Sequence, residues 1–103
     1  MNDLEICKRI AEIEEIYAEL IEHHGSIYYD SPPFQVEFNP LTDDALCFRL
    51  MINYELELEV DSDDGYTVWY VKENKTGVWK EYLCNKSPNK AICLAVIAMH
   101  EED

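Results

Sequence analysis

The sequence is poor in positive charge, in glycine and in long apolar runs. Of its 103 residues only eight are Lys or Arg and only three are Gly. So few glycines leave no cluster of the kind that cradles phosphates, and no stretch approaches the roughly 20 apolar residues of a membrane span. The first five residues also lack the basic and apolar regions of a signal peptide. We therefore expect a cytoplasmic protein.

Cysteine is present, but no pair has the C-x-x-C spacing of a redox or zinc motif. The four cysteines belong to four different predicted elements: Cys7, Cys47, Cys84 and Cys93. Three of them fall among apolar neighbours on predicted helices, where cysteine behaves as a small buried hydrophobe. We expect reduced thiols, with no metal and no cofactor.

Negative charge is the unusual quantity. Twenty-two Asp and Glu face eight Lys and Arg, which gives a formal net charge of −14. A small soluble domain usually needs a magnitude of only about 2–8. The 48% of hydrophobic residues excludes a disordered acidic tail. Such an excess argues against nucleic acid or an anionic membrane as a direct ligand, and it favours either a basic partner or solubility alone.

Three segments are predicted as helices. Apolar residues step by three and four over residues 2–24, and Gly25 is a fitting C-terminal stop. A second helix is predicted to begin at Thr42 as N-cap. The third follows Ser87-Pro88, an N-cap with proline at the first helical position, and runs to about Glu101.

The remaining chain is predicted as loop and strand. Residues 26–40 are punctuated by prolines and predict a loop with a short extended piece from Phe34 to Phe38. Three later segments are predicted as strands joined by short turns: 54–61, 66–73 and 78–84. The whole chain, 1–103, therefore predicts one acidic α+β domain. In it a three-stranded antiparallel meander packs with three helices in the order α-α-β-β-β-α.

Two segments, FNPLTDDA at residues 38–45 and SPNKAICLA at residues 87–95, open the second and third predicted helices. They resemble motifs of the phage ABA sandwich domain family, a group of small phage proteins, and the chain length and element order agree with that family. The resemblance implies a phage or prophage gene and a layered α/β/α sandwich. It implies no activity and carries over no catalytic residue.

The acidic residues alternate with apolar ones along the first predicted strand. Residues two apart on a strand point to the same face and repeat about every 6.6–6.8 Å. A straight row of carboxylates is therefore expected, at a pitch comparable to that of phosphates along one nucleic-acid strand: Glu55, Glu57, Glu59, Asp61 and Asp63. We expect the adjacent Asp64 to extend this acidic group as a partner-binding residue. The alternative is an ordinary solvated strand face, or an edge that charge protects from aggregation.

A second acidic group is expected on the first predicted helix. Four glutamates recur there at spacings of three and four, where like charges repel: Glu12, Glu15, Glu19 and Glu22. They indicate either a second patch for the same basic partner or simply the polar side of an amphipathic helix. The isoleucine-rich side of the same helix is a candidate dimer interface.

The sequence does not predict an enzyme. No nucleophile is accompanied by a recognisable base and oxyanion hole, and a uniformly exposed acidic row does not split carboxylate pKa values as catalytic pairs require. Calcium is disfavoured too, because Gly65 does not fall at the sixth position of any EF-hand register of the nearby acids.

The leading hypothesis is a phage-encoded inhibitor of a host nucleic-acid-binding defence complex, of the anti-CRISPR or anti-restriction type. Its acidic surface would fill a basic channel as a nucleic-acid mimic, in the host cytoplasm, with no direct contact to nucleic acid or membrane. The alternative is a non-enzymatic structural or regulatory protein–protein interaction module, including a homodimer formed through aromatic residues of the sheet or through the isoleucine side of the first helix.

Overall fold

The computed structural model describes residues 1–29, 36–63, 66–75, 78–85 and 87–101. Its helices are α1 (Asp3–Ile13), the short 3-10 helix η1 (Tyr17–Glu19), α2 (Asp44–Asn53) and α3 (Pro88–Glu101). Its strands are β1 (Leu20–His23), β2 (Ser26–Tyr29), β3 (Val36–Glu37), β4 (Leu56–Asp63), β5 (Tyr66–Lys75) and β6 (Val78–Asn85). The predicted α+β class is confirmed.

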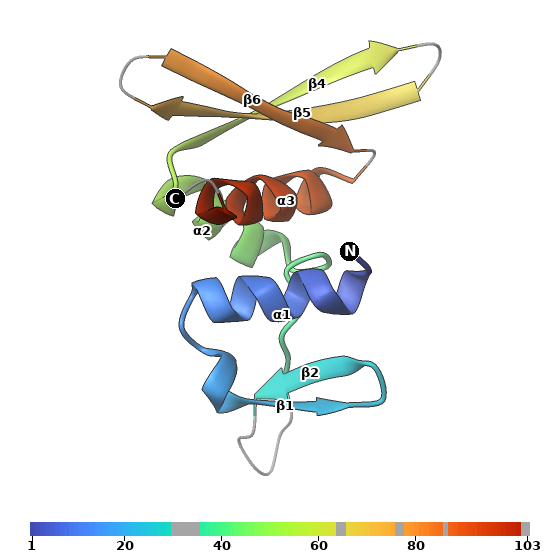
Figure 1. The fold of residues 1–103 in the computed structure, drawn as a ribbon. Helices are drawn as coiled ribbons and strands as arrows, with labels where there is room; N and C mark the ends of the chain where they lie inside the picture. Colours follow the sequence, from blue (N-terminus) through green and yellow to red (C-terminus); the bar gives the residue numbers. More distant parts are fainter. Residues whose placement is uncertain (30–35, 64–65, 76–77, 86, 102–103) are drawn as a thin grey trace.

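The elements are arranged in layers with the helices in the middle (Figure 1). The antiparallel sheet β4-β5-β6 lies at one end of the molecule, and α2 and α3 lie beneath it. Helix α1 forms the next level, and the small antiparallel sheet β1-β2-β3 closes the opposite end. The protein therefore buries its helices between two sheets.

The predicted three-stranded meander is confirmed in order and direction. Strand β4 pairs antiparallel with β5, so that Leu58 lies opposite Val71, and β5 pairs with β6 with an irregularity between Trp69 and Val71. The layered α/β/α arrangement is not the one observed. Helix α3 contacts β5 and β6 and helix α2 contacts β4, and in the described part of the chain both helices lie on one side of this sheet.

The first helix is much shorter than its hydrophobic pattern predicts. It ends at Ile13, because the backbone of Glu15 adopts a left-handed conformation with φ of 61°. The Glu15 N–H donates to the Glu12 carbonyl at 3.1 Å and the Ile16 N–H donates to the Ala11 carbonyl at 3.0 Å. These two bonds form a Schellman motif, which closes a helix most often at glycine. No glycine marks this stop in the sequence.

Residues 20–29, expected to finish that helix and start a loop, form the hairpin β1–β2 instead. His23 lies opposite Ser26, so that His24 and Gly25 make a two-residue turn with φ of 50° and 78°. Positive φ at both central residues is what a type I′ hairpin turn requires. Gly25 therefore serves a strand turn rather than a helix end. In the extended piece predicted from Phe34 to Phe38, Phe34 and Gln35 lie outside the described residues, and Val36–Glu37 form β3.

The two later helices begin near their predicted caps. The N-cap of α2 is Asp43, one residue after the predicted Thr42, and its carboxylate accepts from the Leu46 N–H at 3.1 Å. Helix α3 begins at Pro88 as predicted, and the Ser87 hydroxyl accepts from the Lys90 N–H at 3.3 Å. Capping of this kind satisfies backbone donors that a helix leaves unpaired at its start.

An asparagine joins the starts of α2 and α3. The Asn89 side-chain amide donates to the Leu41 carbonyl at 3.1 Å and to the Asp44 carboxylate at 2.9 Å. The two segments that carry the family resemblance, residues 38–45 and 87–95, are therefore in direct contact. This link sets how the two helices meet.

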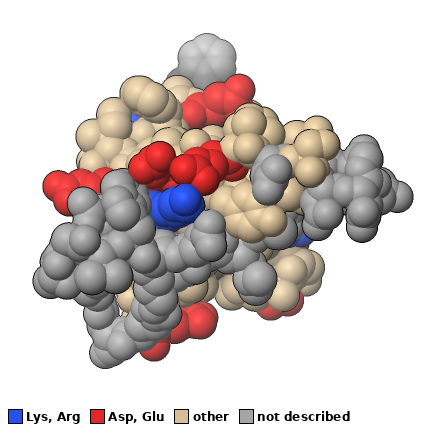
Figure 2. Space-filling model, turned by 90° about the horizontal axis from the view of Figure 1, so that it is seen from above, with Lys and Arg blue, Asp and Glu red and all other residues tan. Residues whose placement is uncertain are grey.

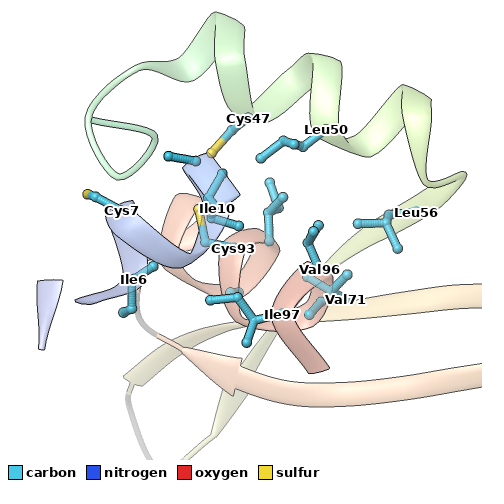
Figure 3. Packing of buried hydrophobic residues seen from close by; sticks show 14 of the residues in the cluster. Ile6, Cys7, Ile10, Cys47, Leu50, Leu56, Val71, Cys93, Val96 and Ile97 are labelled. Atoms are coloured by element: carbon cyan, nitrogen blue, oxygen red, sulfur yellow. The ribbon is translucent and has the colours of Figure 1, made fainter. Parts of the chain in front are cut away.

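The core gathers side chains from all three helices and from both sheets. Helix α3 contributes the largest share, and Ile6 and Ile10 of α1 are 0% exposed (Figure 3). The isoleucine side of α1 is therefore packed against the rest of the molecule. Ile6 and Ile10 are therefore not available for the dimer interface expected on this side of the helix, because they are already buried in the core.

We predict that Glu15→Gly stabilises the protein by about 1 kcal/mol, because glycine adopts positive φ without the steric cost that a β-carbon brings. Urea unfolding followed by circular dichroism measures the change. Glu15→Gln is the matched control, since it removes the same charge but keeps the β-carbon. Equal stabilisation by both variants would show that charge, and not the backbone, is responsible.

We predict that Asn89→Ala destabilises the protein by about 1–3 kcal/mol, because it leaves part-buried hydrogen-bonding groups without their partner. A double-mutant cycle with Asp44→Ala measures the share that belongs to the Asn89–Asp44 bond. Additive effects of the two substitutions would contradict a direct coupling between these side chains.

Candidate functional site

The outer face of β4 carries two members of the predicted carboxylate row, Glu57 and Glu59. Leu56 and Leu58 point toward the helices and are buried or partly buried, and Glu57 and Glu59 are exposed. The alternation fixes this arrangement, because successive strand residues point to opposite faces. Figure 2 looks onto this sheet from above and shows Asp and Glu side chains beside a basic one.

A lysine of the neighbouring strand interrupts the row. Lys72 of β5 lies directly opposite Glu57, and its Nζ is 3.0 Å from a carboxylate oxygen of Glu59. Tyr70 of β5 lies opposite Glu59. The outer face is therefore an acidic surface with an internal cation, where an uninterrupted anionic row was expected. Trp69 belongs to the other face, where it packs against the core.

The ends of the predicted row differ from its centre. Glu55 precedes the strand and has a left-handed backbone with φ of 53°. Its N–H donates to the Ile52 carbonyl, which closes the end of α2. It is exposed beside the row rather than aligned within it. Asp61 and Asp63 lie on the β4 backbone at the expected alternate positions. Their side chains, and all of Asp64, lie outside what the structure describes.

The second acidic group does not share a helix face. Glu12 belongs to α1 and pairs with Arg9 at 3.2 Å, whereas Glu22 belongs to β1 and pairs with Lys8 at 2.6 Å. Glu15 occupies the turn after α1 and Glu19 occupies η1. The predicted helical patch is wrong, because the helix ends before three of its four members.

A pocket that the sequence did not indicate lies where the end of α1, the β1-β2-β3 sheet and α2 meet. Its volume is about 220 Å³. Four lining residues are apolar or aromatic: Ile16, Tyr29, Phe38 and Leu46. Three are polar: Glu14, Arg49 and Asn53. These residues span forty positions in the sequence, so no local motif could have revealed the pocket.

Helix α2 also presents an exposed apolar pair. Phe48 is 62% exposed and Ile52 is 59% exposed, and their spacing of four places them side by side on one helix face. The sequence showed both residues to be apolar but did not show which would point away from the core. A signal was present, because apolar residues cover almost the whole circumference of α2.

The thiols of three cysteines are buried, as predicted: Cys7, Cys47 and Cys93. Cys47 and Cys93 point toward one another from α2 and α3 (Figure 3), and the Cys47 thiol also donates to the Pro40 carbonyl at 2.9 Å. Burial, with the nearby carboxylates of Asp3 and Glu37, raises the pKa of Cys7 to about 11. A hydrogen bond to Cys47 and burial raise the pKa of Cys93. The thiols of Cys7 and Cys93 are therefore protonated and weakly nucleophilic at neutral pH. The hydrogen bond from Cys93 instead lowers the pKa of Cys47.

The three histidines lie in two places in the fold. His100 lies in the last turn of α3, with its Nδ1 2.9 Å from the Val96 carbonyl. His23 and His24 instead belong to the β1–β2 hairpin. Across the described residues, no group of three His, Cys, Asp or Glu side chains is placed to hold a metal ion. No helix in this part of the chain is long and apolar enough to span a membrane.

No family model, no curated protein and no solved structure matches this chain. The resemblance to the phage ABA sandwich domain family therefore stays a prediction from the two segments that carry it.

We predict that Lys72→Gln strengthens binding of a polycation such as poly-L-lysine, by up to about tenfold at low salt, because the substitution frees Glu59 and removes a repelling cation from the outer face. Fluorescence titration across a salt series measures the change. Lys90→Gln is the matched control. Lys90 lies at the start of α3, away from this face, and pairs with Asp3 of α1. An equal effect of both substitutions would mean that only net charge matters.

Proposed function

We propose that this protein is a phage-encoded, non-enzymatic inhibitor of a host nucleic-acid-binding defence complex, which it blocks as an acidic nucleic-acid mimic. CRISPR effector complexes and restriction enzymes are the two kinds of target. The observation that carries the proposal is the outer face of β4, where Glu57 and Glu59 are exposed two residues apart and no described helix covers them.

The charge balance supports binding to a basic surface. Even if each of the eight Lys and Arg neutralised one carboxylate, the net charge of −14 would stay on the molecule. A channel lined with Lys and Arg would be attracted over a distance of about 10 Å at 0.1 M ionic strength. It would also associate faster because of electrostatic steering.

The ion pairs indicate which carboxylates are available for a partner. Glu59 is engaged with Lys72, so the partner would have to compete for it. In the described part of the chain, Glu55 and Glu57 are exposed and make no ion pair. These two side chains therefore carry the proposed contact, and Lys72 limits how closely a cationic channel approaches the centre of the face.

We predict that the protein inhibits DNA binding by a CRISPR effector complex or a restriction enzyme, and that Glu55→Lys with Glu57→Lys abolishes the inhibition. Reversal of both charges converts attraction into repulsion at the proposed contact. Fluorescence anisotropy of a labelled target duplex measures the inhibition, at salt concentrations between about 50 and 200 mM. Inhibition by the unaltered protein is expected to weaken steeply over this range.

The matched control is Glu5→Lys with Glu101→Lys, which reverses two exposed carboxylates on α1 and α3 and leaves β4 intact. This control is expected to keep most of the inhibition. Circular dichroism establishes that each double variant is folded. Inhibition by the Glu55/Glu57 variant at the level of the unaltered protein would overturn the mimic proposal.

The exposed pair on α2 favours a second candidate function, a protein–protein interaction module that does not depend on charge. Phe48 and Ile52 lie next to Arg49 on the helix, and aromatic residues and arginine are enriched in protein interfaces. Light scattering across the same salt series separates the two candidates. Apolar association, including a homodimer, would persist at high salt, whereas a complex held by carboxylates would dissociate.

A further inference from the structure

The pocket beside α2 combines an apolar lining with opposite charges from separate elements. Glu14 is the C-cap of α1, whereas Arg49 and Asn53 lie one turn apart on α2. Within the described part of the chain, neither the Glu14 carboxylate nor the Arg49 guanidinium makes an ion pair. Arg49, which can bind an anion, and Glu14, which can bind a cation, therefore border one small cavity without forming an ion pair with each other.

The apolar lining is held in place by the surrounding structure. The rings of Tyr29 and Phe38 pack edge to face with centroids 6.2 Å apart, and Phe38 is buried. The Phe38 N–H donates to the Ile27 carbonyl at 2.8 Å, which fixes this segment beside β2. Leu46 is anchored at the start of α2, where its N–H bonds to the Asp43 cap. Such preformed lining lowers the conformational cost of binding.

We propose that this pocket binds a single free α-amino acid with an apolar side chain. The ligand carboxylate accepts hydrogen bonds from the Arg49 guanidinium, with the Asn53 amide as a further donor. The ligand ammonium donates to the Glu14 carboxylate. The ligand side chain lies against Phe38 and Leu46. An α-amino acid is the smallest common metabolite class that carries both charges and an apolar group on one carbon.

The size of the cavity supports this class of ligand. At about 220 Å³ the pocket is smaller than the roughly 300–1,000 Å³ of sites for drug-sized molecules. Arginine suits the carboxylate, because its planar fork can donate two parallel hydrogen bonds. A nucleotide or a folded partner would be too large for the cavity, and a purely apolar ligand would gain nothing from either charged group.

The pocket is separate from the acidic face in the fold. Its walls come from α1, α2 and the β1-β2-β3 sheet, whereas the outer carboxylates belong to the β4-β5-β6 sheet (Figure 1). A bound amino acid would bridge three elements and stabilise the folded state through its own binding free energy. The inference therefore stands or fails independently of the proposed inhibition of a defence complex.

The experiment is thermal unfolding of the full chain with each standard L-amino acid at millimolar concentration, followed by isothermal titration calorimetry for those that raise the midpoint. We expect leucine, isoleucine, methionine or phenylalanine to raise it, and aspartate, glutamate and lysine to leave it unchanged. The N-acetyl and the amide derivatives of the best ligand should each bind at least about tenfold more weakly, because each lacks one charge.

Two substitutions assign the ligand charges to protein groups. Arg49→Gln should weaken binding of the free amino acid at least about tenfold, and the variant should no longer prefer the free amino acid to its amide derivative. Glu14→Gln should weaken binding of the free amino acid to the same extent, and this variant should no longer prefer it to the N-acetyl derivative. Arg9→Gln and Glu5→Gln change the same charges elsewhere on α1 and should leave binding unchanged. A flat midpoint with every amino acid, or affinities that Arg49→Gln and Glu14→Gln do not alter, would overturn the proposal.

Discussion

The burial of α3 is the constraint on which the rest of the structure depends. This helix is apolar around most of its circumference, and a helix of that kind must be covered on several sides. It is packed against α1, α2 and the strands β5 and β6. The elements that cover α3 form the outer layers of the molecule, and their outward faces carry the acidic residues. Asn89, at its first turn, ties the same helix to the start of α2 through polar contacts.

Two surfaces of different character result from this arrangement. At one end the β4-β5-β6 sheet turns exposed carboxylates outward, with Lys72 set among them. On its flank α2 presents Phe48, Ile52 and Arg49 beside an aromatic-lined pocket. An acidic surface selects a partner by long-range attraction, whereas a small lined pocket selects by shape and by paired charges. The two surfaces therefore suit different ligands and do not compete.

The prediction of the fold succeeded where the local pattern and the tertiary environment agree. Apolar and acidic residues alternate strictly along β4, and short turns bound β5. Helix α3 begins with a serine followed by proline. Each of these signals was sufficient by itself to predict its element. The prediction of where the first helix ends failed, because the helical spacing of apolar residues continues past Ile13. Its stop depends on Glu15 in a left-handed conformation, which glycine usually signals and glutamate does not. A single misplaced helix end then moved three glutamates off their expected face.

The sequence by itself determined the charge excess, the α+β class, the meander and the shared outward face of Glu57 and Glu59, because these depend on composition and on the short periods of helix and strand. Tertiary structure alone decided the rest. It placed Lys72 beside Glu59, buried the isoleucine side of α1, and brought Glu14, Tyr29 and Arg49 around one pocket. The physical reason is that the packing of whole elements sets the contacts between residues distant in sequence, and local sequence patterns do not determine that packing.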